Sequence, residues 1–158
     1  PSKENCFLIT PIGSEGSSVR KRVDQWTELI YKPALSKDYE LIRADRIETP
    51  GLITEQIVQH IIDAELVIID YTGLNPNVMY EAAIRHLTEK PFIQIYRVGE
   101  HLPFDIHNLR ALPYDPENLQ YPQELVAAIK QSLKEIGSPD YKQMHLVKEK
   151  FVNKLLNE

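Results

Sequence analysis

Residues 66–86 read LVIIDYTGLNPNVMYEAAIRH and combine an apolar run, a polar loop and a helical pattern. Leu66–Asp70 is apolar without alternation up to its last residue, which is typical of a strand covered on both faces. Asn75 is a favourable helix N-cap, and Pro76 suits the first helical position because the N–H that proline lacks is not needed there. The stretch predicts a buried parallel strand followed by a helix that ends near Glu89.

The same alternation of short apolar runs and amphipathic segments extends in both directions from this stretch. Leu66–Asp70 is expected as the third strand, and the other strands are expected over 5–10, 39–44, 92–96 and 110–114. One helix is expected over 18–35, and a second is expected to start at Thr49 and Pro50. Two further apolar stripes predict helices, the first with Val126, Ile129, Leu133 and Ile136 and the last with Met144, Val147, Phe151 and Leu155.

This order predicts an α/β fold, a flavodoxin-like doubly wound sheet of about five mainly parallel strands with helices on both faces. The expected strand order is 2-1-3-4-5, with an extra C-terminal helix. Residues 1–137 are expected to form the domain, and residues 138–158 a helix for packing, oligomer contact or linkage. Ligands of such sheets bind where the strand order reverses, at the carboxyl ends of the strands. The loops over 11–18 and 71–77 therefore form the predicted crevice.

Composition narrows the range of partners. A formal charge of −5 gives no electrostatic reason to expect a nucleic-acid duplex. No apolar run approaches the roughly 18 residues that a membrane span needs, so we expect no membrane partner. The single cysteine, Cys6, lies in an apolar run and is interpreted as a buried core residue in a cytoplasmic protein. Because the chain begins with Pro1 rather than methionine, we expect a module of a longer chain. A homo-oligomer is the alternative, because the apolar stripe from Met144 to Leu155 would suit a subunit contact.

The first loop carries groups suited to an anion. Gly13 and Gly16 allow backbone N–H groups to approach a ligand, and the N-terminus of the following helix favours negative charge. The predicted substrate-binding residues of this loop and helix are Pro11, Ile12, Gly13, Ser17, Ser18 and Arg20. The segment has neither the P-loop ending nor a GxGxxG pattern. Its alternative interpretation is an ordinary capped helix start with a solvated basic face.

The second loop places acidic and amide side chains at the same crevice. Asp70 ends an apolar strand, where a carboxylate needs a partner or a ligand to offset its desolvation. Glu81 lies four residues after Asn77 and four before Arg85, so the three share one helix face. We predict Glu81, Asp70, Asn75 and Asn77 as functional residues of this crevice, with Asn75 and Asn77 as substrate-binding. The alternatives are a surface Glu81 paired with Arg85 and an Asp70 that accepts loop N–H bonds.

Residues 66–86, together with the opening CFLITPIG, resemble the nucleoside 2-deoxyribosyltransferase-like family, over roughly residues 5–96. That family shares a flavodoxin-like fold with Toll/interleukin-1 receptor (TIR) domains. The resemblance implies that Glu81 is the nucleophile that attacks the anomeric carbon of a nucleoside. An acidic residue usually occupies the position of Asn75 in that family. In relatives that act on nucleoside monophosphates, serines and an arginine hold the 5′-phosphate, a role that Ser17, Ser18 and Arg20 would suit.

The leading hypothesis is therefore cleavage or transfer at the N-glycosidic bond of a nucleoside, nucleotide or NAD-like substrate. In this hypothesis Glu81 and Asp70 are the catalytic residues. Asp70 and Asn77 would orient the ribose or base, and Asp45 would reach a ribose hydroxyl. No metal and no cofactor are expected. The alternative is a non-catalytic nucleotide-binding or sensing module, or a TIR-like interaction module of a larger bacterial defence protein.

Overall fold

The computed structural model describes residues 2–47, 52–103 and 106–143. Five parallel strands form one sheet in the order β2-β1-β3-β4-β5, which is the predicted flavodoxin-like arrangement. The elements are β1 (Glu4–Ile9), α1 (Ser18–Trp26), η1 (Thr27–Tyr31), α2 (Lys32–Leu35), β2 (Tyr39–Arg43), η2 (Ala44–Arg46), α3 (Glu55–Asp63), β3 (Leu66–Asp70), α4 (Pro76–His86), β4 (Phe92–Arg97), η3 (Ile106–Leu109), β5 (Ala111–Tyr114) and α5 (Tyr121–Ile136).

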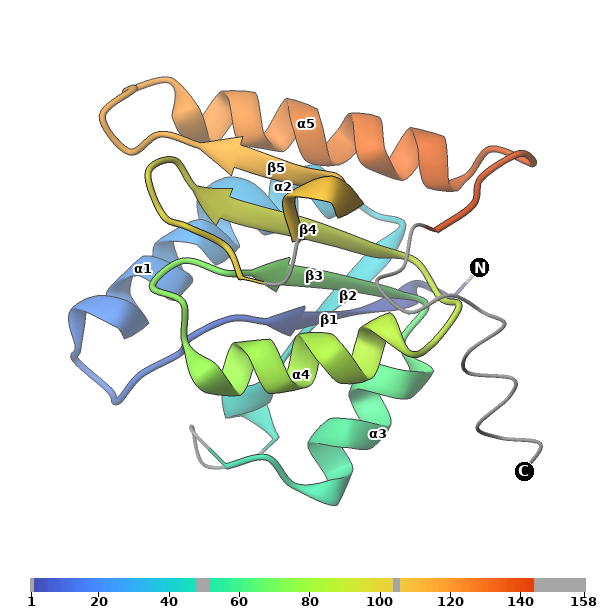
Figure 1. The fold of residues 1–158 in the computed structure, drawn as a ribbon, viewed down its shortest axis with the longest axis horizontal. Helices are drawn as coiled ribbons and strands as arrows, with labels where there is room; N and C mark the ends of the chain where they lie inside the picture. Colours follow the sequence, from blue (N-terminus) through green and yellow to red (C-terminus); the bar gives the residue numbers. More distant parts are fainter. Residues whose placement is uncertain (1, 48–51, 104–105, 144–158) are drawn as a thin grey trace.

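Helices cover both faces of the sheet (Figure 1). Alternate residues of a strand point to opposite faces, so β1 contributes Cys6 and Leu8 to one core and Phe7 and Ile9 to the other. Side chains from α1, α2 and α5 pack against the first of these cores, and side chains from α3 and α4 pack against the second. Burial raises the pKa of the Cys6 thiol, as expected of a structural rather than reactive cysteine.

The helix expected over 18–35 is one helical run with an irregular centre. A π-helical turn, Thr27–Tyr31, separates α1 from α2. Thr27 Oγ1 donates a hydrogen bond to the carbonyl of Val23, at 2.7 Å. Such bonds from a threonine to the preceding turn compete with the regular helical ladder, and they accompany the widened turn here.

The second helix begins later than the sequence suggested. Thr49 and Pro50, the expected start, lie outside the described residues, and α3 begins at Glu55. Its N-cap is Thr54, whose side chain accepts a hydrogen bond from the N–H of Ile57 at 3.3 Å. Both threonines have the chemistry of a cap, so the local sequence alone did not distinguish them.

The remaining differences lie at element ends. Helix α4 ends at His86 rather than near Glu89.

The predicted last helix, with its stripe beginning at Met144, lies outside the described residues. No helix in the part of the chain with described coordinates is long and apolar enough to cross a membrane.

Candidate functional site

The loop between β1 and α1 is tightly packed around Gly13. This residue has a φ of +69°, a conformation that side chains disfavour. A Cβ there would lie 2.7 Å from Ser17 Oγ and 3.0 Å from the Cβ of Val19. Ser17 Oγ accepts a hydrogen bond from the N–H of Arg20 at 3.1 Å and so caps α1. Ser17 therefore has the structural role of a cap at this helix start.

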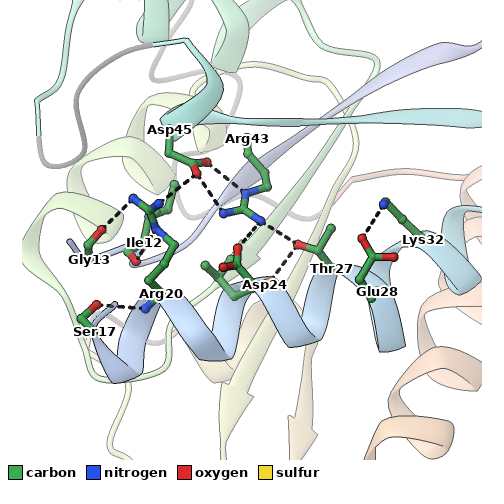
Figure 2. Close-up of polar contacts among 11 residues, drawn as sticks. Ile12, Gly13, Ser17, Arg20, Asp24, Thr27, Glu28, Lys32, Arg43 and Asp45 are labelled. Carbon is green, nitrogen blue, oxygen red and sulfur yellow. Dashed lines mark hydrogen bonds and ion pairs between the residues drawn. The ribbon is translucent and has the colours of Figure 1, made fainter. Parts of the chain in front are cut away.

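Arg20 reaches back over this loop (Figure 2). Its Nη2 donates to the carbonyl of Gly13 at 3.0 Å, and its Nε donates to the carbonyl of Ile12 at 3.4 Å. Its Nη1 lies 3.7 Å from a carboxylate oxygen of Asp45. Two carbonyls and one carboxylate therefore surround the guanidinium, which fixes the backbone of the loop.

Asp45 belongs to an ion-pair network that joins α1 to the end of β2 (Figure 2). Arg43 donates to both oxygens of Asp45, at 3.0 and 2.9 Å, and its Nη1 lies 2.7 Å from Asp24 of α1. A bidentate arginine–carboxylate pair has a defined geometry. Arg43 is buried, so this network holds Asp45 in place for its contact with Arg20.

Asp70, at the end of β3, is buried, and both of its carboxylate oxygens have partners. Its Oδ2 forms an ion pair with Arg22 Nη1 at 2.8 Å and accepts a hydrogen bond from Thr10 at 3.1 Å. Its Oδ1 accepts from the N–H and the hydroxyl of Thr72, at 3.0 and 2.6 Å. The Thr72 hydroxyl also contacts that of Tyr114, at 2.7 Å. Asp70 thus ties the ends of β1 and β3 to α1.

The loop after β3 leads into α4 as the sequence predicted. Asn75 is the N-cap, and its Oδ1 accepts from the N–H groups of Asn77 and Val78, at 2.8 and 3.4 Å. Gly73 and Leu74 both have positive φ, and the Gly73 N–H donates to the carboxylate of Glu100 from the β4–β5 loop. The loop is therefore held at both ends.

The two loops enclose a cavity of about 510 Å³ at the carboxyl ends of β1 and β3. This volume is within the range of small-molecule sites. The lining combines polar residues with apolar side chains, among them Leu52, Ile53 and Val78. The full set is Thr10, Pro11, Ile12, Gly13, Ser14, Glu15, Arg20, Leu52, Ile53, Asn75, Asn77, Val78 and Glu81.

Glu81 lines this cavity from the second turn of α4 and is half-buried. Desolvation raises the pKa of Glu81 to about 7. Among the residues that the structure describes, its carboxylate has no hydrogen-bond or ion-pair partner. A desolvated, unpaired carboxyl group in a cleft is a recognised mark of a functional site.

Arg85, which the sequence offered as an ion-pair partner of Glu81, donates to backbone carbonyls instead. It is fully buried, and its Nη1 donates to the carbonyls of Ile61 and Ala64, at 2.8 and 2.9 Å. Its Nη2 donates to the carbonyl of Pro91 at 2.8 Å. The interpretation of Glu81 as one half of a surface ion pair with Arg85 is therefore wrong.

The structure divides the predicted site residues into two groups. Those that line the cavity are Pro11, Ile12, Gly13, Arg20, Asn75, Asn77 and Glu81. Those that lie outside the cavity lining are Ser17, Ser18, Asp45 and Asp70. Sequence reasoning missed Ser14 and Glu15, although both lie within the predicted loop. It also missed Leu52 and Ile53, which come from a segment expected to be helical.

A second cavity, of about 320 Å³, lies between β4, β5, α5 and residues 138–143. It lies near the start of β4, away from the carboxyl ends of the strands. Its polar side chains make contacts within the protein. Arg110 pairs with Glu135, and Gln143 Oε1 accepts from the N–H of Phe92. Within the described coordinates, no group of three or more His, Cys, Asp or Glu is placed to hold a metal ion.

No protein-family model matches the chain, and a search of the curated proteins found no match. The likeness of residues 5–96 to nucleoside 2-deoxyribosyltransferase-like proteins therefore remains a resemblance.

Proposed function

We propose that this protein cleaves or transfers at the N-glycosidic bond of a nucleoside, nucleotide or NAD-like substrate in the cytoplasm, with Glu81 as the nucleophile. The observation that carries the proposal is the state of Glu81. It is an unpaired and desolvated carboxyl group, mounted on a helix at the wall of a substrate-sized cavity.

The environment of Glu81 suits a positive transition state. Cleavage of an N-glycosidic bond places positive charge on the sugar ring, as in glycoside hydrolysis. A carboxylate that has lost part of its hydration gains more from a nearby positive charge than one in water does, because the local dielectric constant is lower. The interaction is strongest when the charge has developed, so it favours the transition state over the bound substrate.

In the proposed reaction, one oxygen of Glu81 attacks the anomeric carbon of the sugar. The bond from that carbon to the base nitrogen breaks, and the base leaves with the bonding electron pair. A neutral nucleobase then takes up a proton, whereas the cationic nicotinamide of an NAD-like substrate leaves as a neutral molecule without one. Water then attacks the same carbon, forms the sugar hydroxyl and releases the carboxylate, with one proton passing to solvent. In transfer, a second base replaces water.

The other lining residues suit such a substrate in shape and polarity. Leu52, Ile53 and Val78 offer apolar surface for a base or a sugar face. The Oδ1 of Asn75 is used in the helix cap, which leaves its amide N–H groups to orient a ligand. Asp70 contributes from outside the cavity as a positioning residue, since it holds Thr10 at the cavity wall.

The test is release of free base or nicotinamide from a panel of nucleosides, nucleotides and NAD, followed by chromatography. Wild type should release product from at least one compound, and Glu81→Gln should lose at least a hundredfold in rate. Glu89→Gln is the matched control, because it makes the same change at an exposed position just beyond α4. Equal rates for wild type and Glu81→Gln would refute the catalytic role.

The same panel separates the alternative function. A binding or sensing module would be stabilised against heat by a nucleotide without forming product. A ligand at 100 times its Kd should add about 2.7 kcal/mol to the stability. Stabilisation without product in wild type would favour the sensing module.

A further inference from the structure

The Arg20 contacts determine which way two peptide groups of the β1–α1 loop face. The carbonyls of Ile12 and Gly13 both accept hydrogen bonds from Arg20 (Figure 2). The described residues contain no cis peptide bond. In a trans peptide the N–H points opposite to the carbonyl, so the N–H groups of Gly13 and Ser14 point away from the guanidinium.

These two N–H groups have no acceptor among the residues with described positions. Both residues line the 510 Å³ cavity that also contains Glu81. The position of Gly13 is further constrained by its close approach to Ser17 and Val19. Two adjacent amide donors, held in place from behind by an arginine, are a preorganised site for an acceptor oxygen.

The charges around the cavity disfavour an anion at this donor pair. Glu15 and Glu81 line the cavity, whereas the cation of its described lining, Arg20, is already matched by Asp45 and two carbonyls. A phosphate placed there would meet two carboxyl groups without a free counter-charge. A hydroxyl or a carbonyl oxygen accepts the same hydrogen bonds at a far smaller electrostatic cost.

We infer that the amides of Gly13 and Ser14 form a donor pair for an uncharged acceptor oxygen of the substrate, and that Arg20 is a positioning residue for this pair. The inference rests on the proposed function for the identity of the ligand as a nucleoside. It specifies the substrate class further, because it favours a nucleoside over its 5′-monophosphate and removes Arg20 from phosphate binding.

The test is a titration of the ¹⁵N-labelled protein, observed through its amide resonances. The probes are adenosine, inosine and uridine, each compared with its 5′-monophosphate, and inorganic phosphate. At least one nucleoside should shift the Gly13 and Ser14 amides downfield more than its monophosphate or phosphate does. Arg20→Lys, which keeps the charge but loses the fork geometry, should weaken nucleoside binding about tenfold. Lys21→Gln, an exposed neighbour on the same helix, should bind as wild type does.

Several outcomes would overturn the inference. Phosphate could shift the two amides as strongly as a nucleoside, no probe could shift them, or a nucleoside could bind and perturb Asn77 and Val78 alone. The wild-type titration decides these cases even if Arg20→Lys does not fold. Base release measured on the same samples separates this inference from the proposed function. Amide shifts without base release would refute only the reaction, and base release without amide shifts would refute only the donor pair.

Discussion

Nη1 of Arg22 lies 2.8 Å from Oδ2 of Asp70, so the acid that ends the central strand β3 is neutralised from α1. The Asp70 carboxylate is almost fully buried, whereas Arg22 is partly exposed and lies over the ring of Trp26. The ion pair offsets the desolvation of Asp70, so no ligand is needed to explain a carboxylate at the end of an apolar strand. It also links α1, which follows the β1–α1 loop, to the end of β3, where the β3–α4 loop begins.

Replacing Asp70 with asparagine should destabilise the protein by about 3 kcal/mol, because it breaks a buried ion pair and leaves the remaining groups poorly matched. Urea denaturation of the two proteins measures the difference. Asp38→Asn is the control, since Asp38 is exposed, and it should change stability by less than about 0.5 kcal/mol. A similar small effect for Asp70→Asn would show that the buried pair contributes nothing.

Glu81 should make stability fall as pH rises. Desolvation raises its pKa in the folded state to about 7, above the value of about 4.3 for a free glutamate. Between these two values the folded protein holds a proton that the unfolded chain has released, so stability decreases through this window and levels off above pH 7. Glu81→Gln should therefore stabilise the protein at pH 8, by about 1–3 kcal/mol, with little effect at pH 4.

Urea denaturation at both pH values tests this sign. Glu89→Gln, at an exposed position, should show the same small effect at both. A stabilisation by Glu81→Gln that is equal at pH 4 and pH 8 would mean that the carboxyl group is not desolvated.

Base release should follow the ionisation of the same group. A nucleophilic carboxylate must be deprotonated, so kcat/KM should rise with pH through an apparent pKa near 7, the value of Glu81 in the free protein. Steady-state rates between pH 5 and 9 give this profile. A rate that is flat from pH 5 to 7 would be inconsistent with Glu81 as nucleophile.

Arg85 and Glu81 should behave independently despite their i, i+4 spacing. Arg85→Met leaves the carbonyls of Ile61, Ala64 and Pro91 without their donor, so a loss of about 3 kcal/mol or more is expected. In a double-mutant cycle with Glu81→Gln, the coupling energy should stay within about 0.5 kcal/mol. A larger coupling would indicate an ion pair in solution.

Alanine substitutions at Gly13 and Gly16 should separate the cost of backbone strain from the cost of a steric clash. Both have positive φ, but a Cβ on Gly16 meets nothing within 4 Å, whereas a Cβ on Gly13 would collide with Ser17 Oγ. Gly16→Ala should cost about 1–2 kcal/mol from strain alone. Gly13→Ala should cost at least about 1 kcal/mol more, because it also displaces the helix cap. Thermal unfolding measures both, and equal losses would mean that the contact with Ser17 relaxes freely.

The sequence by itself was sufficient for the fold and for the location of the cavity. Apolar runs such as Leu66–Asp70, separated by amphipathic helices, specify a parallel sheet, and the chain order then places two loops at one crevice. The cap formed by Asn75 and Pro76 was also predictable, because it depends on neighbouring residues alone. The position of Glu81 at this crevice was predicted from its spacing along the same helix together with the strand order.

Only the tertiary structure decided what the charged residues do. Asp70 is paired with Arg22, 48 positions away. Arg85 donates to the carbonyl of Ile61 in α3 and to that of Pro91, just before β4. Arg20, which looked like a phosphate ligand, holds loop carbonyls and lies beside Asp45 from the end of β2. The desolvation of Glu81 comes from its burial in the folded chain. Local patterns encode periodicity and caps, but charge pairing and burial depend on segments that meet only when the chain folds.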